Sequence, residues 1–190
     1  MARFTAFVLG CLFLSCILVE AQSPKDLPKY IKNLTAKDAQ ERIAACEGIA
    51  SFGEVKKVLA KDAVDPLCDV LRKDDDAKVR VAAAAALGRI EADASKATPA
   101  LIQGLKDKER PVQVASATAL GYLGSGAKEA VPLLKELAEQ AKAEAAKARE
   151  EQAKAKTDGD KEKERLARAK GQAAGQMLQA AGGALQRIGQ

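Results

Sequence analysis

The chain has 190 residues; 47% are hydrophobic but only 3% aromatic, 40 are alanine, and the formal net charge is +5 at pH 7. This alanine-rich, aromatic-poor composition favours closely packed helices. The chain contains no His, which removes imidazole bases, Ser-His and Cys-His dyads and most zinc or iron sites, so the composition disfavours hydrolases and metalloenzymes.

Residues 1–21 have the three-part form of a secretory signal peptide. Arg3 precedes an apolar run of about 16 residues, whereas a membrane anchor needs about 20. Ala21 ends a Val-Glu-Ala sequence that places small or short residues where a signal peptidase cuts. We expect cleavage after Ala21 and an exported protein, periplasmic or secreted, with no stable membrane span. An uncleaved anchor and a lipoprotein cleaved before Cys16 are the alternatives.

Two cysteines, Cys46 and Cys68, remain after this cleavage. Export implies an oxidising compartment in which they could pair. Both also fall on apolar faces of predicted helices, where free Cys packs as a small hydrophobe. The sequence leaves both interpretations open.

The chain repeats itself with a step of 33 residues. Pro66, Pro99 and Pro132 keep this step, and so do the pairs Leu87-Gly88 and Leu120-Gly121. An earlier unit begins at Pro28 and carries about five extra residues before the next unit.

Each unit follows one plan. A proline in the first turn opens a short helix. An acidic turn, KDDDAK or KDKER, then supplies Asp side chains that can cap a second, alanine-rich helix ending at Leu-Gly. Neither helix can bury its apolar face alone, so the plan predicts helical hairpins that stack side by side.

These residues resemble the HEAT-repeat proteins, in particular the short HEAT-like repeats of phycobilisome-lyase-related and many bacterial proteins. The resemblance covers about residues 24–137 and implies an α-solenoid that binds other macromolecules. In that family an Asp in the turn and an Arg six residues later form a ladder between repeats. Asp74 and Arg80 match this pair, and Asp107 is followed by Gln113 instead. In the first unit Ala36 takes the Asp position and Arg42 is retained, so the ladder is expected to be interrupted.

The fourth unit is lengthened by an insertion of 32 residues between its two helices. We expect both helices to continue outward as an antiparallel arm, with Thr157-Asp158-Gly159-Asp160 as the turn at its tip. A heptad seam is predicted on the outgoing helix and a matching stripe on the returning helix. The outgoing positions are Leu134, Ala138, Ala141, Ala145, Ala148, Gln152 and Ala155, and the returning ones are Leu166, Ala169, Ala173, Met177, Ala180 and Ala184. A disordered Lys/Glu-rich linker is the alternative.

The fold class predicted from the sequence is all-α. It is a short right-handed α-solenoid of about four HEAT-like helical hairpins, the last extended into a long antiparallel helical arm. The expected organisation is a signal peptide at 1–21, a repeat solenoid at 22–137 and the extended final repeat, a charged Ala/Lys/Glu-rich hairpin, at 138–190.

Positive charge is concentrated in the arm: residues 22–140 have a net charge of +1 and residues 141–190 a net charge of +4. Because Lys and Glu alternate in the arm, a solvated helical surface is favoured over a nucleic-acid site.

The sequence predicts no enzyme, and no catalytic, cofactor-binding or metal-binding residue. It favours an exported scaffold or adaptor that binds a protein partner through its second helices. The candidate binding residues are Arg42, Arg80, Arg89 and Gln113. The alternative is a structural envelope protein whose basic arm, residues 141–170, pairs with another helix or binds an anionic surface.

Overall fold

The computed structural model describes residues 26–55 and 59–189, and these residues form helices and turns without any strand. The predicted signal peptide at 1–21 lies outside the described residues. In chain order the elements are α2 (Leu27–Asn33), α3 (Ala39–Val55), η1 (Leu59–Ala63), α4 (Val64–Lys73), α5 (Ala77–Arg89), α6 (Ala94–Gly104), α7 (Arg110–Leu123), η2 (Gly124–Ala130), α8 (Val131–Thr157) and α9 (Lys161–Ile188).

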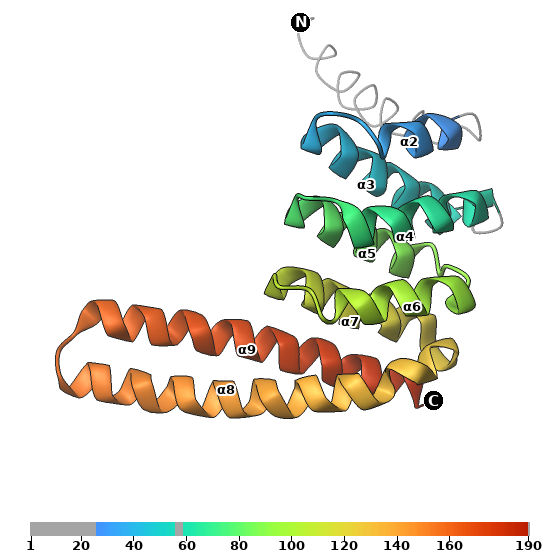
Figure 1. The fold of residues 1–190 in the computed structure, drawn as a ribbon. Coiled ribbons are helices and arrows are strands. Elements are labelled where there is room, and N and C mark those ends of the chain that lie inside the picture. The colour runs from blue at the N-terminus through green and yellow to red at the C-terminus, as the bar shows by residue number, and fades with distance from the viewer. Residues whose placement is uncertain (1–25, 56–58, 190) are drawn as a thin grey trace, which may run out of the picture.

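The helices stack as pairs in two layers. Figure 1 shows α2/α3, α4/α5 and α6/α7 one below another, with the much longer α8/α9 pair closing the stack and projecting to one side. The second helices contact one another in succession, α3 with α5, α5 with α7 and α7 with α9, and α4 contacts α6 in the first layer. The prediction of an all-α helical-repeat solenoid with an extended last hairpin is confirmed.

Of the four prolines predicted to open the first helices, Pro28, Pro66, Pro99 and Pro132, all but one lie in the first turn. Pro28 and Pro132 occupy the first turn of α2 and α8. The prediction is wrong for Pro99, which lies inside α6 because that helix begins earlier, at Ala94. Asp93 allows this earlier start, since its carboxylate accepts a hydrogen bond from the N–H of Ser95 at 3.0 Å and caps the helix.

Glycines let the second helices approach closely. A Cβ atom on Gly88 of α5 would lie 2.9 Å from the Cα of Ala119 in α7, and one on Gly121 of α7 would lie 3.0 Å from the Cα of Ala184 in α9. These positions face backbone and leave no room for a side chain. The Leu-Gly pairs of the repeat therefore mark the contacts between successive second helices.

The predicted seam on α8 is confirmed. Its seven positions are all buried or half-buried, and the fully buried ones include Ala141, Ala148 and Ala155. α8 also continues through residue 138 without a break. The arm is thus an extension of the fourth pair of helices, because the same two helices form both.

The predicted stripe on α9 is wrong in the outer part of the arm. Leu166 is 56% exposed and Ala169 is exposed, whereas Ala167 and Ala174 are buried. The reason is that α9 contacts two helices, α8 along the arm and α7 near the stack. The predicted stripe is the side of α9 that faces α7, as the contact of Ala184 with Gly121 shows, and it stays uncovered beyond α7.

The tip of the arm lies where the sequence predicts it. α8 ends at Thr157 and α9 begins at Lys161. Gly159 has a φ of +70°, a left-handed conformation that favours glycine. The side chain of Asp160 accepts a hydrogen bond from the N–H of Lys163 at 3.0 Å and caps α9. Local turn chemistry therefore defines this end of the hairpin.

Candidate functional site

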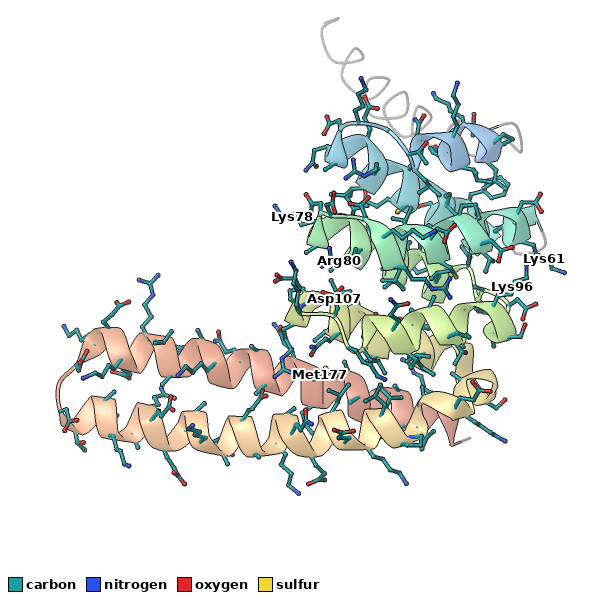
Figure 2. All side chains as sticks on the ribbon, viewed as in Figure 1. Lys61, Lys78, Arg80, Lys96, Asp107 and Met177 are labelled. Carbon is teal, nitrogen blue, oxygen red and sulfur yellow. The ribbon has the colours of Figure 1, made fainter. Side chains whose placement is uncertain are left out.

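Two arginines connect successive repeats through paired hydrogen bonds. Arg42 of α3 donates from Nε and Nη2 to the carboxylate of Asp74 at 2.7 and 2.9 Å. Arg80 of α5 donates in the same way to Asp107 at 2.8 and 3.0 Å. Figure 2 shows Arg80 and Asp107 on the side of the stack from which the arm projects. Each Arg therefore binds the acidic turn of the following repeat.

The side chains at these positions also donate hydrogen bonds to the turn of their own repeat. Nη1 of Arg42 donates to the carbonyl of Ala36 at 2.9 Å, and Nη1 of Arg80 donates to the carbonyl of Asp74 at 2.8 Å. Gln113 makes the equivalent bond, from Nε2 to the carbonyl of Asp107 at 2.7 Å. Gln113 thus makes the hydrogen bond to the turn of its own repeat. It lacks the guanidinium with which Arg42 and Arg80 also bind the acidic turn of the following repeat.

The interruption of the ladder that the sequence predicts at Gln113 is confirmed. Asp107 still belongs to the ladder through Arg80 of the preceding repeat, and the interruption comes after it, at Gln113. A different pair replaces the missing link, since Arg110 at the start of α7 donates to Glu144 of α8. The base of the arm is thereby joined to the stack.

The charged side chains of the ladder are paired with one another within the chain. The side chain of Arg80 is only 7% exposed, and that of Arg42 only 15%. Hydrogen bonds to Asp74 and Asp107 raise the pKa of Arg42 and Arg80, respectively, although burial opposes this. The structure thus gives these two residues a bracing geometry.

The four predicted binding residues do not form one cluster. Arg42, Arg80 and Gln113 follow the starts of successive second helices, whereas Arg89 is exposed in the last turn of α5. A binding role for these four residues stays a prediction.

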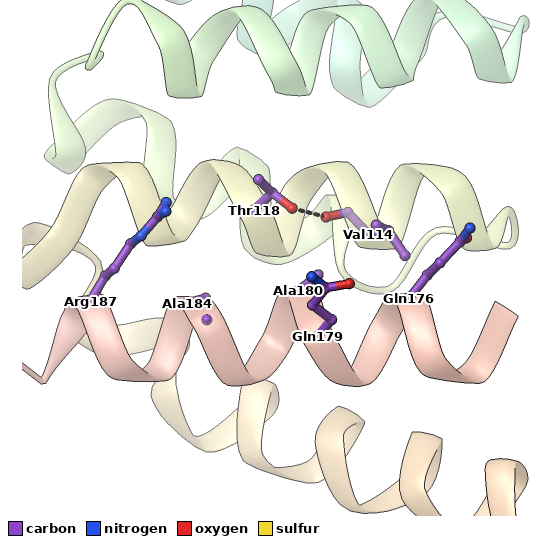
Figure 3. A pocket seen from close by; sticks show the side chains of 8 residues that line it. Val114, Thr118, Gln176, Gln179, Ala180, Ala184 and Arg187 are labelled. Atoms are coloured by element: carbon purple, nitrogen blue, oxygen red, sulfur yellow. Dashed lines mark hydrogen bonds between the residues drawn. The ribbon is translucent and has the colours of Figure 1, made fainter. Parts of the chain in front are cut away.

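A groove that the sequence does not predict lies between α7 and α9. It has a volume of about 360 Å³. Its lining residues are Val114, Thr118, Gln176, Gln179, Ala180, Gly183, Ala184 and Arg187. Figure 3 shows Gln176 and Arg187 rising from α9 toward α7 at its two ends.

The groove combines an apolar floor with polar side chains on the rim. Ala180 and Ala184 belong to the stripe of α9 that faces α7, and Thr118 donates its hydroxyl to the carbonyl of Val114 at 2.9 Å. The sequence contains a signal for it: Gln176, Gln179, Gly183 and Arg187 recur at helical spacing beside the apolar stripe. That signal becomes a groove only once α9 is known to lie against α7.

Arg187 at one end of the groove is held by an aromatic ring. Its guanidinium carbon lies 4.8 Å from the centre of the Tyr122 ring, within the range of a cation–π contact. The Tyr122 side chain is 51% exposed, so the stacked pair faces solvent.

A larger hollow of about 690 Å³ lies between α2 and α4, but its charges are mostly paired within the chain. Asp65, Asp69 and Asp74, which line it, form ion pairs with Lys96, Lys73 and Arg42. We therefore take the α7/α9 groove as the better candidate site.

The described residues offer no evident place for a metal or a reactive thiol. No group of three or more Cys, Asp or Glu in residues 26–55 and 59–189 has a metal-binding arrangement. Cys46 and Cys68 are both free and buried. Burial raises the pKa of Cys46 to about 12 and also raises that of Cys68. Among the helices that the structure describes, none is long and apolar enough to cross a membrane.

The stacked pairs and the ladder between them define an α-solenoid of helical repeats. A family model for HEAT repeats matches residues 27–90 and 64–154, which together exceed half of the chain. The chain belongs to the HEAT-repeat family. HEAT repeats commonly serve as protein-interaction scaffolds, and the family is typically non-catalytic. No curated protein matches the chain.

Proposed function

We propose that this protein is a non-catalytic scaffold that binds a protein partner in the groove between α7 and α9. The observation that carries the proposal is the contrast between two sets of polar side chains. Arg42 and Arg80 form hydrogen bonds between repeats. In contrast, Gln176, Gln179 and Arg187 line an open groove and are exposed to solvent. A surface with apolar floor and polar rim suits a peptide segment of a partner.

A photo-crosslinking amino acid at Thr118 tests this assignment in the full chain. Its side chain is exposed in the groove, and Gln103, exposed on α6 in the other layer, provides the control position. We expect one discrete protein adduct from Thr118 in an extract of the source, and none from Gln103. The purified adduct partner should then bind the wild-type chain and not Val114→Glu. A partner that binds both chains equally would contradict the proposal.

A second candidate function rests on the charge pattern of the arm. Lys135, Lys142, Arg149 and Lys156 are exposed on α8 at seven-residue spacing, each one residue after a seam position. At 1.5 Å per residue this basic row is roughly 31 Å long. We propose that it rests on an anionic lipid surface, for which each Lys or Arg contributes about 1 kcal/mol.

Two acidic residues of α8, Glu144 and Glu151, support this orientation, whereas Glu139 pairs with Lys142 of the row at 3.9 Å. Glu144 and Glu151 lie three residues after a seam position, which places them on the flank opposite the basic row. Glu144 pairs with Arg110 of α7, and Glu151 pairs with Lys170 of α9 at 3.0 Å. The flank toward the stack is therefore partly neutralised, and the basic row is on the flank away from it.

Vesicle co-sedimentation tests the second candidate. The full chain should sediment with vesicles of phosphatidylglycerol and phosphatidylcholine at low salt and not with phosphatidylcholine alone. The triple variant Lys135→Gln, Arg149→Gln, Lys156→Gln should lose most of this binding. A control with the same charge change on the repeats, Lys29→Gln, Lys61→Gln, Lys78→Gln, should keep it. Equal loss in both variants would contradict a role for the row.

Export is also proposed, on the pattern of residues 1–21. The test is the N-terminal sequence of the protein purified from its source. We expect it to begin at Gln22, and a protein that retains Arg3 would contradict cleavage.

A further inference from the structure

We propose that the α7/α9 groove binds an extended peptide and that Arg187 binds an Asp or Glu side chain of that peptide. This inference rests on the proposed function, because it names the chemistry of the partner at the same groove.

The length of the groove fits a short extended segment. Gln176 and Arg187 stand at its two ends on α9, 11 residues apart, which corresponds to roughly 16 Å along a helix. An extended chain rises about 3.3 Å per residue, so about five residues span this distance. Gly183 lies between the two ends, and a Cβ atom there would meet nothing within 4 Å. The floor is therefore open to a peptide backbone.

The polar side chains of the rim match a backbone rather than a second charged surface. Thr118, Gln176 and Gln179 are uncharged and supply both hydrogen-bond donors and acceptors. A peptide backbone presents the complementary N–H and C=O groups along its whole length. These three residues can therefore hold an extended segment with little preference for its side chains.

Arg187 gives the groove a preference for a peptide with an acidic side chain. Among the described residues that line the groove it is the only charged one, so the groove has a charge of +1. The contact with the Tyr122 ring restrains the guanidinium of Arg187, and the N–H edge of a guanidinium matches the two oxygens of a carboxylate. In an unmodified peptide, the anionic groups available to this guanidinium are carboxylates. Free C-termini are commonly captured by backbone N–H groups, whereas here the donor is a long side chain, which suits an acidic side chain.

An array of random octapeptides, acetylated and amidated at their ends, tests the proposal with the full chain. The blocked ends leave Asp and Glu as the only carboxylates. We expect bound peptides to share an acidic residue at one position. A second array with free C-termini should bind no better, and a requirement for the free C-terminus would overturn the assignment to a side chain.

Fluorescence anisotropy with the best peptide then tests the role of Arg187. Arg187→Gln should weaken binding about tenfold, and changing the acidic residue of the peptide to its amide should have the same effect. Combining both changes should cost little more, because they remove one interaction. Arg187→Lys should be intermediate, and Arg165→Gln, an equal charge change on the arm, should bind normally.

The possible failures are distinguishable. Binding that is lost in Val114→Glu but unaffected by Arg187→Gln would overturn the carboxylate assignment and leave the docking groove intact. If no octapeptide binds the wild-type chain, the inference is overturned, while the crosslinking experiment at Thr118 independently decides the proposed function.

Discussion

Arg80 and Asp107 are buried charges whose partners come from different repeats. Their side chains are 7% and 14% exposed, and two hydrogen bonds join them. Removing one partner from such a pair leaves a charge without compensation in a poorly solvated place, which costs more than the pair itself contributes. At the residue scale the ladder therefore holds the stack in register because each repeat completes the charge balance of the next.

We expect Asp107→Asn to lower the free energy of unfolding by about 2 kcal/mol, because Arg80 then lacks a carboxylate. Urea unfolding followed by circular dichroism measures this. Asp65→Asn is the control, since it removes only the exposed pair with Lys96 and should leave the midpoint unchanged. Equal effects of the two substitutions would contradict the bracing role.

The pair of Arg80 and Asp107 makes the stability of the fold depend on pH. Burial disfavours the ionised form of Asp107, but hydrogen bonds from Arg80 and from the N–H of Glu109 outweigh it and hold the pKa of Asp107 below its ordinary value of 3.8. A lowered pKa stabilises the fold above the ordinary value, and this contribution is lost as the pH falls through the lower pKa of the folded state. The stability difference between wild type and Asp107→Asn should therefore be constant at about pH 5 to 7 and shrink below about pH 4.

We expect both cysteines to resist alkylation in the folded protein. Cys46 and Cys68 are buried, and burial raises the pKa of both thiols, so little of the reactive thiolate forms at neutral pH. Mass spectrometry after iodoacetamide treatment should show Cys46 and Cys68 modified in urea and neither of them modified under native conditions. Rapid modification of either one in the native protein would contradict their burial.

At the scale of helices, glycines at different positions have opposite effects on stability. Gly88 of α5 is a contact point with α7, where a Cβ atom would lie 2.9 Å from the Cα of Ala119. Gly175 of α9 is also helical, but a Cβ atom there would meet nothing within 4 Å. One glycine is required by packing and the other only weakens its helix.

The substitution of alanine for each glycine separates these two cases. Gly88→Ala should destabilise the protein by about 1 to 3 kcal/mol, because the backbone of α7 must move to accept the methyl group. Gly175→Ala should stabilise it by up to about 1 kcal/mol through helix propensity. Urea midpoints measured side by side give both signs, and a stabilising Gly88→Ala would show that α5 and α7 are less closely packed.

At the scale of the whole molecule, the stack and the outer arm differ in what they bury. The base of the arm contributes Leu134, Met177 and Ile188 to the main core, whereas beyond it the buried residues are alanines such as Ala148 and Ala167. Alanine buries little apolar area, so the outer arm adds little to the stability of the stack.

Shortening the arm should therefore leave the stack folded. A Cβ atom on Gly171 would lie 3.5 Å from the Cβ of Ala148, so a short turn can join these positions when residues 149–170 are removed. We expect loss of the corresponding helical circular dichroism signal and a change of less than about 1 kcal/mol in the unfolding of the remainder. Global unfolding of the shortened chain would show that the outer arm is part of the core.

The sequence by itself determined the features that depend on near neighbours in the chain. The 33-residue step, the seam on α8, the turn before Lys161 and the small residues at Gly88 and Gly121 were all predictable, because helix periodicity and turn chemistry act over a few residues. The pairing of Arg42 with Asp74 and of Arg80 with Asp107 spans 32 and 27 positions, and only the stacking of repeats brings these residues together. The tertiary structure also decided which stripe of α9 is buried, since that helix packs against α8 along the arm and against α7 at the stack. The groove follows from the same arrangement. Its two walls, α7 and α9, are distant in sequence, and no local sequence pattern predicts that they lie side by side.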